Sequence, residues 1–277
     1  MSLNSVNTNV GAMIALQSLN AINGELFTVQ RRISTGLRVS SVKDDPATWA
    51  IAQNQRAESR SLDAVKTSLQ RGQSIADVAI AGAESISDLL IQMKEKALAA
   101  SDPTITAADK ALLSEDYIAL RKQIDRVATN ATFGGVSLIS AGSAGNVRSL
   151  ANSSASSTID VDHVDLSTTG GAISGTLADL SGTIGTADLT AIDTALKAVN
   201  AATAKFGTGA KALDTHLTFV GKQQDVIDAG IGRLVDADLA KESARLQALQ
   251  VKQQLAIMAL GIANSAPSML LQLFRGS

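Results

Sequence analysis

The chain has 277 residues, a formal net charge of −2 at pH 7, no cysteine and only 3% aromatic residues. The missing cysteines exclude disulfides, cysteine-ligated metals and cysteine nucleophiles, and the balanced charge without a basic patch argues against nucleic acid as a partner. A core with so few rings favours close packing between helices over the ring-anchored core of a compact enzyme.

Residues 6–33 are predicted to form the first helix, because apolar residues recur along them with the period of a helix that packs lengthwise on another. The main row is Ala12, Leu19, Leu26 and Ile33, and the second row is Leu16, Asn23 and Gln30. The polar residues of the second row weaken an isolated coiled coil but can fix its register. Gly36 ends the helix, since glycine tolerates the left-handed conformation that follows a helix.

A longer helix is expected to begin at Pro46, where Asp44 and Asp45 offer an N-cap, and to stop at Asp102-Pro103. Its two rows are Leu62, Leu69, Ala76, Ala83, Leu90 and Ala97, and Val65, Gly72, Ala79, Ile86, Met93 and Ala100. A shorter helix is expected over residues 107–130. Its rows are Leu113, Leu120 and Val127, and Tyr117, Ile124 and Ala131.

Residues 132–186 differ from the rest, because Ser, Thr, Gly and Ala dominate and charged residues are sparse. The short alternating runs Thr158–Leu166 and Ala172–Leu177 predict the strands of a hairpin. We expect this insert at the far end of the helical rods.

Two further helices are predicted after the insert. Over 187–234 the rows are Ile192, Val199, Phe206, Leu213, Val220, Ile227 and Leu234, and Leu189, Leu196, Thr203, Ala210, Leu217, Gln224 and Ile231. The pattern then shifts by one residue to Leu239, Leu246, Gln253 and Leu260, beside Glu242, Leu249, Ala256, Ala263 and Leu270. Asp236 or Asp238 is expected to cap the last helix.

The predicted fold class is mainly α, with long antiparallel helical rods in a coiled-coil-like bundle and a small insert that contains a β-hairpin. No stretch approaches the roughly 20 apolar residues of a membrane span, so no membrane is expected as a partner. The N-terminus also lacks the features of a secretory signal peptide.

No catalytic, cofactor-binding or metal site is expected. His163 and His216 are far apart in sequence and have no metal-ligand spacing. The acidic residues around Asp162 lack the glycine and the closing glutamate of a calcium loop. Asp44-Asp45 could be read as an acid–base pair, but the start of a helix explains the two residues better.

The two ends of the chain carry longer motifs. Leu16, Asn20, Asn23 and Leu26 precede Arg31-Arg32-Ile33-Ser34-Thr35-Gly36-Leu37-Arg38-Val39, then Lys43-Asp44-Asp45-Pro46-Ala47 and Ala50-Ile51-Ala52. Near the other end, the run Asp236-Ala-Asp-Leu-Ala-Lys-Glu-Ser-Ala-Arg-Leu-Gln-Ala-Leu-Gln leads to Gln254, Ala263-Asn264, Pro267 and Leu270-Leu271-Gln272-Leu273-Phe274-Arg275. Together with Phe133-Gly134-Gly135, these stretches resemble the terminal signatures of bacterial flagellins over about residues 1–140 and 190–275.

The resemblance implies a structural protein, not an enzyme, that polymerises into the helical filament of the bacterial flagellum. It implies a terminal coiled-coil domain that lines the filament core (1–40 with 236–277), a helical rod domain (41–131 with 187–235) and a small variable outer region (132–186). The residues expected to carry polymerisation lie on the terminal helices: Leu16, Leu19, Leu26, Ile33, Leu239, Leu246, Leu249, Leu260, Leu270 and Phe274.

The resemblance also implies partners and a location. The partners are further copies of the chain, the flagellar type III export apparatus, and the hook-associated and cap proteins, and the location is the extracellular flagellum. Flagellins sensed by a Toll-like innate receptor carry an R-x-R-E-L-A-V-Q-like stretch, which here reads Gln92-Met93-Lys94-Glu95-Lys96-Ala97-Leu98-Ala99. Because Gln92 lacks a guanidinium and Lys96 adds a charge, we expect weak or absent receptor activation.

Three other functions are alternatives to the filament subunit. A hook–filament junction protein would share the terminal rods, and self-polymerisation without a partner distinguishes the two. An enzyme on the same scaffold, such as a zinc peptidase in the variable region, would need an HExxH motif, which the sequence lacks. A helical signalling rod would need a membrane span or a ligand-binding domain.

Overall fold

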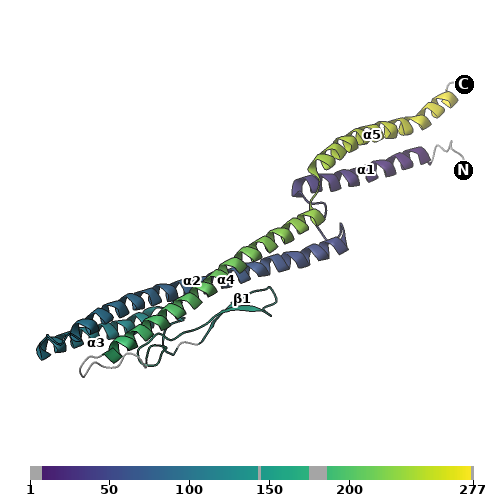
Figure 1. The fold of residues 1–277 in the computed structure, drawn as a ribbon. Helices are drawn as coiled ribbons and strands as arrows, with labels where there is room; N and C mark the ends of the chain where they lie inside the picture. Colours follow the sequence, from purple (N-terminus) through teal and green to yellow (C-terminus); the bar gives the residue numbers. More distant parts are fainter. Residues whose placement is uncertain (1–7, 143–144, 175–185, 276–277) are drawn as a thin grey trace. The chain divides into compact units, whose positions relative to one another are not determined.

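The computed structural model describes residues 8–142, 145–174 and 186–275, and it places their side chains except those of 186–187 and 266–275. Within these residues the elements are α1 (Val10–Thr35), α2 (Pro46–Ala100), α3 (Ala107–Asn130), β1 (Val147–Leu150), β2 (Thr158–Val161), α4 (Thr186–Val235) and α5 (Leu239–Arg275) (Figure 1). The predicted class, mainly α with a small hairpin, is confirmed. The chain divides into two compact units, Met1–Ala57 with Val226–Ser277, and Glu58–Asp225.

The helices begin and end where local chemistry sets their limits. The Asp45 carboxylate accepts the backbone amides of Ala47 and Thr48, both at 3.1 Å, and so caps α2. Gly36 follows α1 with φ of 71°, the left-handed conformation expected there. Of the two candidate caps for α5, Asp238 is the one used, because its Oδ1 accepts the Lys241 amide at 3.1 Å.

The unit Glu58–Asp225 is built on the heptad rows predicted for α2. Every residue of both rows is buried, from Leu62 to Ala100. From α4 the first predicted row is buried, Ile192, Val199, Phe206, Leu213 and Val220, together with Ala195 and Ala202, which lie in neither predicted row. The helix α3 adds Tyr117 and Ile124. Although α2 and α4 have 55 and 50 residues, no helix among the described residues is apolar enough to cross a bilayer.

The insert differs from its prediction in both strands and position. The antiparallel hairpin pairs β1 with β2, with Val147 opposite Val161 and Leu150 opposite Thr158. The predicted strand Thr158–Leu166 is therefore right only in its first four residues. Residues 172–174 of the other predicted strand form a turn, and Gly175–Leu177 lie outside the described residues.

The hairpin also packs along the middle of the helices and not at their far end. Leu150 donates its backbone amide to Ser68 Oγ on α2 at 3.0 Å, and His216 Nε2 on α4 contacts the Ala151 carbonyl oxygen at 2.7 Å. The close approach depends on glycine, because a Cβ on Gly209 would lie 2.9 Å from Val161 Cγ1. A Cβ on Gly82 would lie 2.7 Å from Ile139 Cδ1, and a Cβ on Gly72 would collide with Ser149 Oγ. The insert therefore approaches the helices closely at three glycines.

Candidate polymerisation surface

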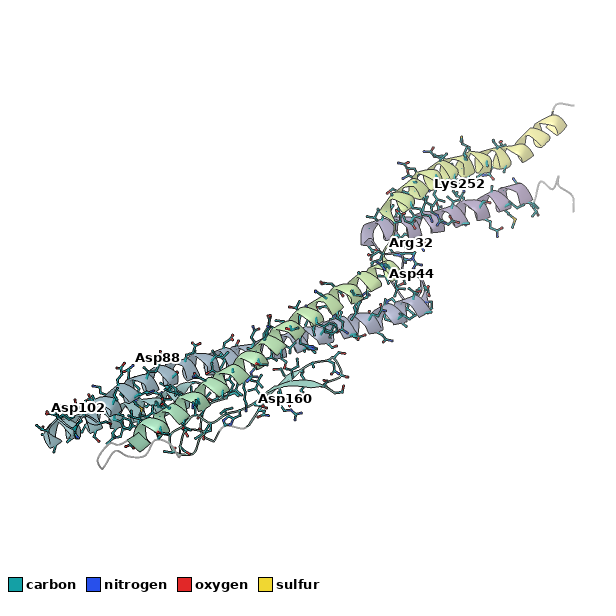
Figure 2. All side chains as sticks on the ribbon, viewed as in Figure 1. Arg32, Asp44, Asp88, Asp102, Asp160 and Lys252 are labelled. Carbon is teal, nitrogen blue, oxygen red and sulfur yellow. The ribbon has the colours of Figure 1, made fainter. Side chains whose placement is uncertain are left out.

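The two terminal helices, α1 and α5, lie side by side and antiparallel (Figure 1). Asn9 at the start of α1 donates its side-chain amide to the Ala263 carbonyl oxygen at 2.7 Å, whereas Arg32 near its end pairs with Glu242 at 3.2 Å. Between them, Gln253 Nε2 donates to Asn23 Oδ1 at 2.7 Å. In Figure 2, Arg32 and Lys252 mark two positions along this pair.

A small apolar core holds the pair together. Leu26 and Val29 of α1 and Leu249 of α5 are buried, and the half-buried side chains packed against them are Ile22, Ile33 and Leu246. Leu246 and Leu249 come from the two adjacent rows predicted for α5. The predicted apolar face of α5 is therefore the one that packs against α1 within the chain. Burying aliphatic side chains of this size contributes about 1.5–3 kcal/mol each when burial is complete.

The second row predicted for α1 does not form the apolar contact with α5, although its member Asn23 accepts a hydrogen bond from Gln253 of α5. The row that completes the contact with α5 is Ala15, Ile22 and Val29, three residues from the main row, and Leu16, Asn23 and Gln30 are exposed. Positions three and four residues away lie on opposite flanks of the main row, so the period alone does not choose between them. Packing against α5 determines which of the two rows is buried.

The predicted polymerisation residues fall into three groups. Leu26 and Leu249 are buried inside the pair, with Leu19, Ile33, Leu246 and Leu260 half-buried. Leu16 and Leu239 are each 49% exposed. Leu270 and Phe274 lie in the last turns of α5, outside the residues whose side chains the structure describes.

A further set of apolar side chains on these helices is exposed to solvent. The exposed members besides Leu16 and Leu239 are Val10, Met13, Ile14, Phe27, Val251, Leu255, Ile257, Met258 and Ile262. The sequence prediction missed most of them because it assigned a single apolar face, made of two adjacent rows, to each helix. The spacing from Val251 to Ile262 carries a visible signal, since its steps of four, three and four residues form a second heptad row.

The connection from α1 to α2 is held against the connection from α4 to α5. Arg38 donates to the Leu234 carbonyl oxygen at 2.6 Å, and Ala237 donates its amide to Gly36 at 2.9 Å. A cluster of four buried residues, Val39, Ala52, Ile231 and Val235, lies beneath, with Trp49 packed against it. On the N-terminal side these contacts come from the stretch Arg31–Ala52, which contains most of the N-terminal signature motifs.

Asp44 organises this connection (Figure 2). Its carboxylate accepts hydrogen bonds from the amides of Ser40 and Ser41 at 3.1 and 3.0 Å, and it pairs with Arg31. Burial alone would raise the pKa of Asp44, but the hydrogen bonds from Ser40 and Ser41 and the Arg31 charge outweigh it and lower the pKa below 3.8. The hydroxyl and amide of Thr48 likewise lower the pKa of Asp45.

Comparison with known proteins agrees with the motifs at both ends. Residues 6–144 match the bacterial flagellin N-terminal helical region, and residues 189–274 match the C-terminal helical region. Flagellin FljK of Caulobacter vibrioides is 54% identical over 99% of this chain and 100% of its own length. A flagellin of Brucella melitensis is 35% identical over 98% of this chain and 99% of its own.

This chain belongs to the bacterial flagellins. It is a structural protein, a subunit of the flagellar filament, and the family places it in the extracellular flagellum. A solved structure of a Vibrio parahaemolyticus protein described as flagellar hook-associated matches 70% of this chain and 100% of its own with a TM-score of 0.57. At 15% identity it shows the shared fold alone, so the junction-protein alternative is not favoured.

The stretch predicted to correspond to the receptor-sensed one, which contains Gln92, Glu95 and Lys96, lies on α2. Gln92 and Glu95 are exposed, and Lys96 pairs with Asp116 of α3 at 2.7 Å. The Lys96 charge is thus directed to a carboxylate of the same chain.

The two histidines serve the insert, since His216 contacts Ala151 and His163 Nε2 contacts the Ser140 carbonyl oxygen at 3.0 Å. Among the described residues, no group of three or more His, Cys, Asp or Glu side chains could hold a metal ion.

Proposed function

We propose that residues 1–40 with 236–277 form the domain that lines the filament core and joins one subunit to the next. One observation carries this proposal: α1 and α5 bury one apolar row between them and leave others, such as Phe27 and Ile262, in contact with solvent. Exposed apolar surface of this kind marks a protein–protein contact. Leu16 and Leu239, exposed in the isolated chain, would be covered by neighbouring subunits.

The remaining segments would form the outer layers. Residues 41–131 with 187–235 would be the rod domain, which the buried rows of α2 and α4 support. Residues 132–186 would be the outward variable region, a short one that packs along the rods and gives a thin filament.

A charge placed in the exposed apolar surface tests the polymerisation domain. Leu16→Glu should abolish filament growth from seeds, as measured by sedimentation and electron microscopy, because burying an unpaired carboxylate is costly. The matched control is Gln17→Glu, which adds the same charge at the exposed neighbouring position and should polymerise. Normal growth of the Leu16→Glu chain, with helix content unchanged in both variants, would reject the assignment.

The further partners follow from family membership. The chain would be secreted through the flagellar type III export apparatus and would contact hook-associated and cap proteins at the ends of the filament. Blocking the export gate of a flagellated host should retain the protein inside the cell. A purified chain that polymerises only with a hook-associated partner would support the junction-protein alternative instead.

The proposed function includes no enzymatic activity, supported by the structural role of the family and by the missing HExxH motif. A zinc analysis with a casein-cleavage assay tests this, and proteolysis that depends on zinc would overturn it.

Gln92, Glu95 and Lys96 would make this flagellin a weak activator of the Toll-like innate receptor, or an inactive one. Support comes from the missing guanidinium at Gln92 and from Lys96, which is held by Asp116. A reporter-cell assay should show little response to the native chain and a larger one to Gln92→Arg with Lys96→Leu. A full response to the native chain would refute this.

A further inference from the structure

The outer edge of strand β2 is open to a further strand. Ala151 donates its backbone amide to the Ser157 carbonyl oxygen at 2.9 Å, and in an antiparallel ladder such pairs alternate with pairs whose backbone groups point outward. The amides and carbonyls of Thr158 and Asp160 therefore point away from β1. No other backbone group in the described part of the chain pairs with them.

The edge of β1 is used within the chain. Leu150 points its amide outward from β1 and donates it to Ser68 Oγ of α2 at 3.0 Å. The hairpin thus has one edge held against α2 and one open edge, that of β2. An open edge is where an extended segment of another protein adds a strand to a sheet, because the free amides and carbonyls form the template for pairing.

A cleft of about 430 Å³ follows the open edge, between β2 and α4. On one side it is bounded by the contact of Val161 with Gly209, where a Cβ would lie 2.9 Å from Val161 Cγ1. Beyond this contact the α4 side is lined by small, exposed residues, Ala204, Thr208 and Ala212. The helix from Ala204 to Ala212 spans about 12 Å and a four-residue strand spans about 13 Å, so the cleft matches β2 in length.

The charges around the cleft limit what fits it. Asp160, labelled in Figure 2, and Asp162 are exposed and two residues apart, so both lie on the outer face of the hairpin. Asp160 pairs with Arg148 at 3.4 Å, whereas Asp162 accepts the Asn146 amide at 2.9 Å. A carboxylate has about four acceptor sites, so both can accept more. Lys205 lines the α4 side of the cleft.

We infer that the open edge of β2 binds an extended segment of another protein, which adds a third strand to the hairpin. The segment carries basic side chains at alternate positions, facing Asp160 and Asp162, and small apolar side chains between them, facing α4. Lys205 disfavours a basic side chain on the α4 side, so the alternation is required. A second copy of β2 is a poor occupant, because pairing two such edges would set like carboxylates against each other.

This site goes beyond filament assembly and does not depend on it, because β2, α4 and the cleft belong to one chain and to one compact unit, Glu58–Asp225. Strand addition can therefore be measured on the dilute single chain. The probes are two short peptides of equal composition with blocked termini. In one, lysine and valine alternate, and in the other the lysines and the valines form two separate blocks.

We expect the alternating peptide to slow hydrogen exchange at the amides of Thr158 and Asp160. The block peptide should bind about tenfold more weakly, because it cannot keep its lysines on one face of a strand. An alternating glutamate–valine peptide should not bind. Equal affinities for the two lysine peptides, slower exchange only at other amides, or no binding at all would overturn the inference.

Two variants separate the edge from its charges. Asp160→Pro removes an outward amide and leaves the inward pairs, because proline is tolerated where the amide of an edge strand faces solvent. It should weaken the alternating peptide by about tenfold, whereas Asp160→Asn keeps the amide and should weaken it by about threefold. Exchange at Ile159, whose amide points to β1, reports whether the hairpin is intact in each variant.

Asp162→Lys covers the case in which the proline variant loses the hairpin. It reverses a charge outside the ladder and should shift the preference from the lysine–valine to the glutamate–valine peptide. Unchanged affinities in both variants would overturn the site. Filament growth should be normal in every variant, so loss of peptide binding counts against this site alone, and failure of the native chain to assemble counts against the polymerisation domain alone.

Discussion

Gln224 of α4 donates its side-chain amide to the Asp63 carboxylate of α2 across 2.9 Å. The same amide donates to the Ser59 carbonyl oxygen at 3.2 Å, and Lys66 donates to the Gln224 side-chain oxygen. Gln224 occupies a position of the second heptad row, where the neighbouring members Leu217 and Ile231 are apolar. A polar layer of this kind fixes the register of two helices at some expense of stability.

Gln224→Ala should destabilise the rods by about 1–2 kcal/mol, because several partly exposed hydrogen bonds of about 0.5–1.5 kcal/mol each are lost together. Urea unfolding followed by circular dichroism measures the change. Lys222→Ala, at an exposed position on the same helix, is the control and should stay within about 0.5 kcal/mol of the native chain. Equal effects of the two substitutions would contradict a specific role for the polar layer.

Gly72→Ala should destabilise the protein by about 1–3 kcal/mol through overpacking, because a Cβ there would collide with Ser149 Oγ of the hairpin. Adding Ser149→Ala should restore much of the loss, since the other contacts of that Cβ are at 3.4 Å. Gly221→Ala is the control: its Cβ would meet nothing within 4 Å, and alanine favours a helix by up to about 1 kcal/mol. Stabilisation by Gly72→Ala would show that the hairpin does not pack there.

Acid should loosen the connection around Asp44. A carboxyl whose pKa is lowered by folding adds stability that is present above its unfolded pKa of 3.8 and is lost as the pH falls below that value. Fluorescence of Trp49, the one tryptophan of the chain, reports on the neighbouring core. Asp44→Asn should lower stability at pH 7 and flatten the acid dependence below pH 4, with Asp45 and Asp102 contributing to what is left. An unchanged acid profile would exclude Asp44 as the cause.

Tyr117, the one tyrosine of the chain, should ionise only near the alkaline limit of the folded state. Burial, helped by the nearby Asp188 charge and opposed by Arg121, raises the pKa of Tyr117 to about 12. Because the unfolded pKa is about 10, stability should fall as the pH rises from 10 to 12. The tyrosinate absorbance of the native protein should rise about two pH units later than that of the urea-unfolded chain, and coincident titrations would refute the burial of the ring.

The limits of several helices and the buried rows of α2 could be predicted from the sequence alone. Gly36, Asp45 and Asp102 mark helix limits because each favours a particular backbone conformation or caps free amides. The two rows of α2 could also be predicted, because their residues are apolar or small at heptad spacing and all of them are buried.

The remaining features depend on tertiary packing. Strands of four residues carry little periodicity, and the pairing of Val147 with Val161 is selected by the room that Gly209 leaves. The heptad spacing from Val251 to Ile262 is visible in the sequence. A single chain nevertheless gives no reason to expect apolar rows on two different faces of one helix.

The β1–β2 turn points to a practical use of this flagellin. Residues 153–157 are exposed, and Ala155 adopts φ of 55°, a conformation that a longer loop would relax. The glycines against which the insert packs, Gly72, Gly82 and Gly209, are on helices and would be untouched by a change here. A foreign peptide placed between Ser153 and Ser156 would therefore be carried once per subunit, making the polymer a repetitive antigen-display scaffold.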